Sequence, residues 1–164
     1  MANDFKLVTL EPQNIISVRR VIPMAGYGDF VGPTIGRLYG VASEAGLTPA
    51  GGSLSLSYSP PTETIDAAAA ITIKDDVAAV PAGLPADVKV ETLPGGKAAT
   101  VTYVGDYSGL PGVYRDMGDW IQQQGLTTRA APWEEYVCGP ECSEEQPCES
   151  CKNGPVTVIN WPVS

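Results

Sequence analysis

Two glutamates stand between aromatic residues in the stretch Ala131–Val137, which reads Ala-Pro-Trp-Glu-Glu-Tyr-Val. Trp, Tyr and Val favour β-strands, so we expect a strand here. Side chains alternate along a strand, so Glu134 shares one face with Tyr136, and Glu135 shares the other with Trp133. An aromatic ring attracts an organic cation by roughly 0.5–2 kcal/mol, and a carboxylate adds Coulomb attraction that grows as water is excluded. The stretch therefore suits the capture of a lipophilic cation; alternatively, both glutamates are solvated charges at a strand edge.

The four cysteines of the chain all lie in one short segment with the spacing C-x3-C-x5-C-x2-C, at Cys138, Cys142, Cys148 and Cys151. Four thiolates can hold one zinc ion tetrahedrally, and such a site has no open position for catalysis. The spacing therefore predicts a structural zinc site. Two disulfides, which a reducing cytoplasm disfavours, and free thiols with a redox use are the alternatives.

The composition excludes several classes of function. The chain has 164 residues, no histidine and a formal net charge of -9. Without histidine there can be no Ser-His or Cys-His nucleophile pair and no histidine metal ligand. An acidic protein repels phosphate, so we expect no nucleic-acid partner.

The N-terminus lacks a basic region followed by an apolar run, and no window approaches roughly 18 apolar residues. We therefore expect a cytoplasmic protein that does not enter a membrane.

The sequence contains a weak internal repeat. Gly46-Leu47-Thr48 recurs as Gly125-Leu126-Thr127. On the same shift several structural positions coincide, namely Gly26 with Gly105, Ile22 with Val101, Ile35 with Tyr114, Leu38 with Met117, Val41 with Trp120, Ala42 with Ile121 and Leu54 with Trp133. Such self-similarity indicates the duplication of one structural unit. We expect a single domain of residues 1–164 with halves at about residues 1–76 and 87–164 and a linker at 77–86.

Each half is expected to contain an extra first strand followed by a strand–helix–strand–strand unit. Runs rich in Val, Ile and aromatic residues predict the strands, at Lys6–Leu10, Ile15–Ile22, Ser53–Tyr58, Asp66–Lys74, Val88–Leu93, Lys97–Val104, Pro132–Cys138 and Val156–Val163. Apolar residues at three- and four-residue steps predict helices through Ile35–Ala45 and Val113–Ile121. Pro33 and Pro111 are expected near the helix starts, and Gly46 and Gly125 at left-handed C-terminal caps.

The predicted fold class is α+β, with an antiparallel sheet and two helices on one of its faces. The strand Ser53–Tyr58 alternates Ser and Leu, which predicts one wet face. Two similar halves would pack about a pseudo-twofold axis and leave a central cleft between the helices. Grooves at internal interfaces are frequent ligand sites; alternatively, the duplication serves only to build a stable core.

Three motifs carry a resemblance to a known family: Gly-Asp-Tyr-Ser-Gly-Leu-Pro at 105–111, Pro-Trp-Glu-Glu-Tyr-Val at 132–137, and the terminal Trp161-Pro162-Val163. With these motifs and its two halves, the chain resembles GyrI-like small-molecule-binding domains. This is the family of gyrase-inhibitory proteins and of effector-binding domains in multidrug-responsive transcription regulators. The resemblance covers essentially the whole chain apart from the cysteine-rich insertion at 138–151. No helix-turn-helix segment precedes the domain, so we expect a free-standing binder or one that works on a partner protein.

The resemblance implies an aromatic-lined cleft that binds bulky, flat, hydrophobic and often cationic compounds. In the family, a buried glutamate of an E-x-Y strand pairs with the positive charge, and Glu134 holds that position here. Capture without turnover, as in the sequestration of a drug or toxin, is the expected function. Some stand-alone members resemble hydrolases of strained cyclopropane-containing toxins, so an alternative is that Glu134 acts as a general base. A third alternative is a protein-interaction module acting on a regulator or a topoisomerase.

Further side chains are candidates for the cleft wall, although most aromatic residues are simply core. Trp161, in the last strand, is expected across the sheet from Glu134. Tyr39 and Tyr114 are expected on the two helices near the proposed axis. The candidate ligand contacts beside Glu134 are Tyr136, Trp133, Trp161, Tyr114, Trp120, Tyr107, Tyr39 and Met117.

Overall fold

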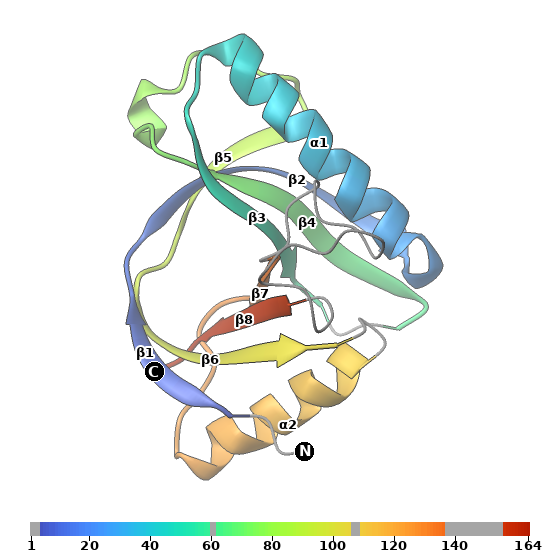
Figure 1. Cartoon of the computed structure of the whole chain (residues 1–164), viewed down its shortest axis with the longest axis vertical. Coiled ribbons are helices and arrows are strands. Elements are labelled where there is room, and N and C mark those ends of the chain that lie inside the picture. The colour runs from blue at the N-terminus through green and yellow to red at the C-terminus, as the bar shows by residue number, and fades with distance from the viewer. Residues whose placement is uncertain (1–3, 60–61, 106–108, 137–155) are drawn as a thin grey trace. The chain divides into compact units, whose positions relative to one another are not determined.

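The computed structural model describes residues 4–59, 62–105, 109–136 and 156–164 (Figure 1). The chain forms two compact units, one of residues 11–95 and one of residues 1–10 with 96–164. Within the described residues the fold class is α+β, with antiparallel strand pairs and an α-helix in each unit, which confirms the predicted class. None of the described helices is both long enough and apolar enough to span a membrane.

The unit of residues 11–95 pairs its four strands antiparallel in the order β5–β2–β4–β3. They are β2 (Gln13–Pro23), β3 (Pro49–Ser57), β4 (Thr64–Ile73) and β5 (Val88–Leu93). Helix α1 (Tyr27–Ala45) follows the short 3-10 helix η1 (Met24–Gly26), and η2 (Val77–Ala79) lies between β4 and β5. In Figure 1, α1 crosses one face of this sheet, and it packs mainly against β4. Four consecutive alanines of β4, at 67–70, are completely buried, and alternation directs two of them to the face that α1 covers.

The other unit pairs its strands antiparallel in the order β1–β6–β8–β7. They are β1 (Lys6–Leu10), β6 (Gly96–Val104), β7 (Trp133–Tyr136) and β8 (Val156–Pro162), and the helix is α2 (Leu110–Gln123). Apolar residues of α2 share one buried core with Val101 of β6 and Ile159 of β8. Because these two strand residues are opposite each other in the register, α2 covers the sheet face to which they point (Figure 1).

The predicted helix ends are present in the structure. Gly46 caps α1 in the left-handed conformation at φ 72°, and Gly125 follows the last turn of α2 at φ 73°. These positive φ values favour glycine, which has no Cβ to clash with the backbone. Pro111 stands in the first turn of α2, where its missing N–H leaves no helix carbonyl unpaired.

Helix α1 begins earlier than the sequence predicts. Its first residue is Tyr27, so Pro33 lies inside the helix rather than near its start. Phe30 and Val31 are buried and attach the additional turn to the core of the unit. Their burial offsets the hydrogen bond that the proline cannot donate.

The extra strands pair differently from the expected halves. β1, near the start of the chain, pairs with β6, and β5 pairs with β2. In each unit the order is therefore the same: the extra strand, the strand before the helix, the second strand after the helix, and the first strand after the helix. Hydrophobic alternation identifies a strand but does not say which of two similar edges it joins. The duplication, its pseudo-twofold axis, the central cleft and the domain boundaries stay predictions.

The serines that alternate with leucines in β3 form a face that is only partly exposed. Ser55 is completely buried and is hydrogen-bonded to the hydroxyl of Tyr27 in α1. The Tyr39 hydroxyl lies 3.2 Å from Ser53 Oγ. The prediction of a wet face was wrong at Ser55, which pairs with a tyrosine of the helix instead of with water, whereas Ser53 and Ser57 are partly exposed.

Candidate functional site

The register of β7 determines where its two glutamates lie. Glu134 is opposite Ile159 of β8, on the face that α2 covers. Glu134 is only 4% exposed, whereas Glu135 is partly exposed. A solvated strand edge is therefore excluded for Glu134, and the structure makes it the buried carboxylate of the pair.

Two tyrosine hydroxyls hold the Glu134 carboxylate. The Tyr114 hydroxyl of α2 donates to Glu134 Oε2 at 3.0 Å, and Tyr136 is hydrogen-bonded to the same carboxylate. Burial raises the pKa of Glu134 to about 7 because the charged form loses water, and the two hydrogen bonds oppose that rise. Within the described ranges no lysine or arginine forms an ion pair with Glu134. Glu134 is a buried acid that titrates near neutrality without a cation from these residues.

Trp161 completes an aromatic group around Glu134. It lies on β8 two residues beyond Ile159, which places it on the same face and diagonal to Glu134. The rings of Tyr114 and Trp161 meet edge to face, with centroids 6.1 Å apart and an interplanar angle of 72°. The structure thus brings together four predicted contact residues, namely Glu134, Tyr136, Tyr114 and Trp161.

Two other candidates belong mainly to the core under α2. Met117 is completely buried in the cluster that joins α2 to β6 and β8. Trp120 packs against the same cluster, and its ring centroid lies 5.9 Å from that of Phe5. Both stabilise the helix that carries Tyr114, which is a structural role independent of any ligand contact.

Trp133 is not part of the group around Glu134. Trp133 is opposite Asn160, on the other face of the sheet, and is 1% exposed. Its Nε1 has no hydrogen-bond partner in the described structure. Tyr39 belongs to the unit of residues 11–95, where its hydroxyl meets Ser53.

Several predicted site residues lie outside the described residues, namely Tyr107 and the four cysteines Cys138, Cys142, Cys148 and Cys151. Within the described ranges, no group of three or more His, Cys, Asp or Glu side chains is placed to hold a metal ion. The zinc site therefore stays a prediction from the cysteine spacing.

The sequence analysis did not single out Thr157. This residue is completely buried on β8, and its Oγ1 has no hydrogen-bond partner in the described part of the chain. Alternation along the last strand could have placed it on the same face as Trp161. Its burial next to Glu134 depends on the pairing of β7 with β8, which no local pattern specifies.

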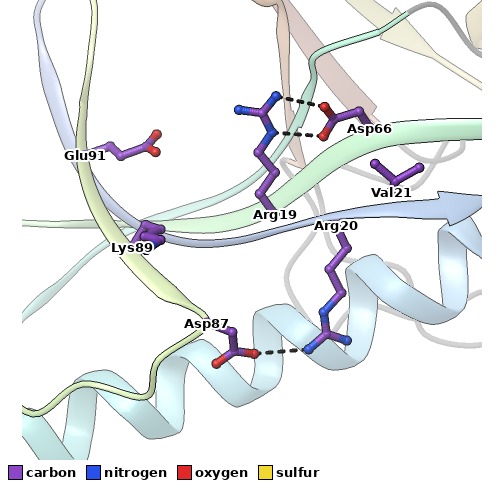
Figure 2. A pocket seen from close by; sticks show the side chains of 7 residues that line it. All are labelled: Arg19, Arg20, Val21, Asp66, Asp87, Lys89 and Glu91. Carbon is purple, nitrogen blue, oxygen red and sulfur yellow. Dashed lines mark hydrogen bonds and ion pairs between the residues drawn. The ribbon is translucent and has the colours of Figure 1, made fainter.

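The unit of residues 11–95 carries an open surface pocket in which charges largely neutralise one another. Figure 2 shows its lining, which is Arg19, Arg20, Val21, Asp66, Asp87, Lys89 and Glu91. Arg19 donates two hydrogen bonds to Asp66, at 2.9 and 2.8 Å, and its guanidinium lies 3.7 Å from the centroid of the Tyr58 ring. The Arg19 guanidinium also lowers the pKa of Asp66 from its usual value. This pocket is an ion-paired surface rather than a buried site.

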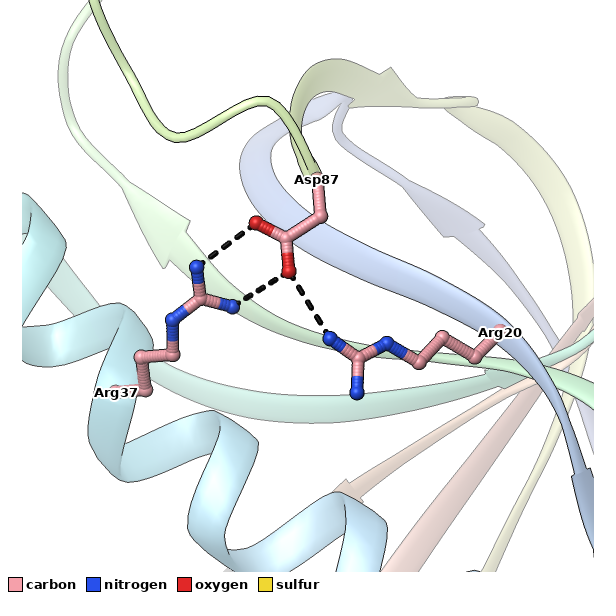
Figure 3. Close-up of polar contacts among 3 residues, drawn as sticks. All are labelled: Arg20, Arg37 and Asp87. Carbon is pink, nitrogen blue, oxygen red and sulfur yellow. Dashed lines mark hydrogen bonds and ion pairs between the residues drawn. The ribbon is translucent and has the colours of Figure 1, made fainter.

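Asp87 joins three elements of that unit. Figure 3 shows its carboxylate between Arg37 of α1 and Arg20 of β2. Arg37 donates to both carboxylate oxygens, at 2.7 and 2.8 Å, and Arg20 donates to one of them at 3.1 Å. The Arg37 guanidinium holds the pKa of Asp87 well below its usual range. These contacts fasten the start of β5 to the helix and are structural.

Comparisons with known proteins agree with the fold. A family model described as the GyrI-like small molecule binding domain matches residues 3–149. No curated protein matches the chain in sequence. Among solved structures, the C-terminal domain of EcmrR matches with a TM-score of 0.80 at 20% identity, covering 100% of this chain and 99% of that one. The chain covers 57% of the longer EcmrR chain in a complex with DNA, at a TM-score of 0.79 and 20% identity.

Two further solved structures share the fold. SAV2435, bound to tetraphenylphosphonium, matches with a TM-score of 0.60 at 18% identity, over 98% of this chain and 94% of that one. A hydrolase from Listeria innocua matches with a TM-score of 0.61 at 14% identity, over 98% and 91%. At these identities the likenesses establish the fold alone.

Proposed function

Because the chain belongs to the GyrI-like small molecule binding domain family, we propose that it binds bulky, hydrophobic and often cationic aromatic compounds at Glu134. The observation that carries the proposal is a buried carboxylate that two tyrosines hold and that no described lysine or arginine neutralises. Burial of a carboxylate without a counter-ion is unfavourable, and the raised pKa of Glu134 reflects that cost. A bound organic cation would supply the missing charge where water is excluded.

The rings beside Glu134 suit the hydrophobic part of such a ligand. A cation over an aromatic face gains roughly 0.5–2 kcal/mol. We assign direct contacts to Glu134, Tyr136, Tyr114 and Trp161, which the structure brings together. The further candidates of this proposal are Trp120, Met117, Trp133, Tyr39 and Tyr107.

The proposed role is capture of drugs or toxins in the cytoplasm, either as sequestration or as a signal to a partner protein. EcmrR occurs in a complex with DNA, but its chain there is longer than this one. For the residues present here we propose no direct contact with nucleic acid, because the net charge of -9 repels phosphate. A regulator or topoisomerase as partner is the third candidate, which co-purification from cell extract would test.

Calorimetric titration with tetraphenylphosphonium tests the proposal. Triphenylphosphine oxide, a neutral compound with similar aryl groups, serves as the comparison ligand. At a pH above 7 we expect saturable binding of the cation and weaker binding of the neutral compound. Glu134→Gln should weaken binding of the cation by at least about tenfold, because the buried charge is lost while the shape is kept.

Glu135→Gln is the matched control, since it removes the same charge from the adjacent residue of the same strand. It should leave binding of the cation nearly unchanged. Equal binding of charged and neutral compounds, equal effects of the two substitutions, or no binding by a folded protein would each contradict the proposal.

Hydrolysis of a strained cyclopropane-containing toxin is a second candidate function. It is favoured by the pKa of Glu134, about 7, because a general base is most effective when its pKa is near the working pH. Glu134 would accept a proton from water as the water oxygen bonds to a ring carbon. The strained carbon–carbon bond would break, and the other carbon would take up a proton. A hydrolase from Listeria innocua shares this fold.

Mass spectrometry distinguishes hydrolysis from capture. A hydrolase should convert such a toxin to a product heavier by one water, and Glu134→Gln should abolish the product while binding persists. Saturable binding with unchanged toxin would leave capture as the function.

A further inference from the structure

Thr157 is a second polar group buried on the same sheet face as Glu134. It lies on β8 directly opposite Tyr136 of β7 and Tyr103 of β6. Alternation along β8 places it on the face of Ile159, and therefore on that of Glu134. Thr157 is 0% exposed, and its Oγ1 has no hydrogen-bond partner in the part of the chain that the structure describes.

The two tyrosines opposite Thr157 place their hydroxyls in different surroundings. The Tyr136 side chain is hydrogen-bonded to Glu134. The Tyr103 hydroxyl lies at the start of α2, where a Cβ on Gly109 would be 2.1 Å from it. Thr157 is thus flanked by two tyrosines, one hydrogen-bonded to Glu134 and the other with its hydroxyl at the start of α2.

An unpaired buried hydroxyl destabilises a folded protein, and buried polar side chains are nearly always hydrogen-bonded. Valine would fill the same volume without this cost. The unpaired Nε1 of Trp133 does not bear on this site, because Trp133 lies on the opposite sheet face with Asn160. The hydroxyl of Thr157 therefore calls for a hydrogen-bond partner beyond the residues that the structure describes.

We propose that Thr157 determines specificity by pairing, through Oγ1, with a hydroxyl or amino group on the ligand whose cation meets Glu134. The inference rests on the proposed function, since it adds a second polar contact to the same site. Glu134 and Thr157 are diagonal neighbours on paired strands, so their positions are roughly 7–8 Å apart. The favoured ligand is an aromatic cation with a hydrogen-bonding group across the ring from the charge.

Two phosphonium ions that differ by one hydroxyl test this inference. Tetraphenylphosphonium has no hydrogen-bonding group, and (4-hydroxyphenyl)triphenylphosphonium has one para to phosphorus. Wild-type protein should bind the hydroxylated ion roughly three- to tenfold more tightly, as expected for one buried hydrogen bond. Thr157→Val should abolish this preference and leave the affinity for tetraphenylphosphonium unchanged, while Thr157→Ser should retain it.

Stability of the unliganded protein gives an independent readout. If Oγ1 is unpaired in the absence of ligand, Thr157→Val should raise the thermal midpoint, although it weakens binding of the hydroxylated ion. If Thr157 had only a structural role, Thr157→Val would lower the thermal midpoint and would not weaken binding of the hydroxylated ion. A lower midpoint in a protein that still folds would mean that the hydroxyl is already paired, and would overturn the inference.

The failure of this inference can be told apart from failure of the proposed function. Equal wild-type affinities for the two ions, both weakened by Glu134→Gln, would overturn the role of Thr157 and leave cation capture intact. No binding of either ion by folded wild-type protein would overturn both. The wild-type comparison needs no variant, so it decides the matter even if Thr157→Val fails to fold.

Discussion

A buried polar residue hydrogen-bonded to a helix tyrosine occurs in both units. Ser55 on β3 is bonded to Tyr27 of α1, and Glu134 on β7 accepts from Tyr114 of α2. Both are buried on the first strand after the helix of their unit. The same local arrangement therefore carries a neutral hydroxyl in one unit and an ionisable acid in the other. Only the acid can respond to pH or attract a cation.

Glu134 should make the stability of the unliganded protein depend on pH. Burial raises its pKa from 4.5 to about 7, so the folded state holds a proton that the unfolded state releases. The stabilisation by the protonated form is fully present below about pH 4.5 and is lost as the pH rises through about 7. The loss is on the order of 3 kcal/mol.

Urea unfolding of Glu134→Gln across this pH range checks the expectation. The variant should be more stable than wild type above about pH 7, and its own stability should change less between pH 4.5 and 7. Glu135→Gln should keep the wild-type profile. If Glu134→Gln kept the wild-type dependence of stability on pH, other titratable groups would be responsible for it.

At the scale of elements, the position of α2 depends on a close contact at its first turn. Tyr103 of β6 brings its hydroxyl against Gly109, where a Cβ would be 2.1 Å away. Because α2 carries Tyr114, this contact bears on the site. Gly118, in contrast, has open space around an added Cβ.

Two glycine-to-alanine substitutions in this element should have opposite effects. Gly118→Ala should stabilise the protein by roughly 0.5–1 kcal/mol, since alanine is the better residue inside a helix. Gly109→Ala should destabilise it by about 1–3 kcal/mol, because Tyr103 or the helix start must move. Thermal unfolding of both variants measures these changes in stability. Similar midpoints for the two variants would show that the contact of Tyr103 with Gly109 does not limit the position of α2.

The segment 138–151 lies between β7 and β8 in the sequence and carries all four cysteines. If it binds structural zinc, protein purified under reducing conditions should contain about one zinc ion per chain. Cys148→Ser and Cys151→Ser should each release the metal, and a chelator should lower the thermal midpoint. Elemental analysis measures the zinc content, and a thiol assay measures whether the cysteines are reactive or oxidised. Protein without zinc, in either thiol state, would contradict the zinc site.

At the scale of the whole molecule, the chain does not pass through its units one after the other. β1 belongs to the unit of residues 96–164, and residues 11–95 form the other unit between them. The first and last residues of the unit of residues 11–95 lie close together, since a Cβ on Gly95 would lie 2.7 Å from Cδ of Pro12. The pairing of β1 with β6 also brings Phe5 onto Trp120.

Removal of residues 1–10 should therefore destabilise the unit of residues 96–164 selectively. β6 would lose its ladder to β1, and Trp120 would lose Phe5, for a total of roughly 1–3 kcal/mol. Hydrogen exchange should show loss of protection in β6, with β2 and β4 still protected. If protection from exchange were lost selectively in β2 instead, the first strand would belong to the half of residues 1–76 that the sequence predicted.

Much of the fold was predictable because secondary structure follows local chemistry. Alternating and three- to four-residue apolar periods predicted the strands and both helices, and Gly46 and Gly125 marked the helix ends. Pro33 was misplaced because buried Phe30 and Val31 lengthen α1, an effect of packing rather than of local propensity.

The sequence by itself determined that Glu134 shares a strand face with Tyr136, because side-chain alternation is a property of the strand alone. Only the tertiary structure decided that this face lies under α2, that Tyr114 reaches the carboxylate, and that Thr157 is buried without a partner among the described residues. It also decided that Ser55 is buried and that β1 pairs with β6. Burial, strand pairing and the pKa of Glu134 depend on contacts between residues far apart in the chain, and no local pattern encodes them.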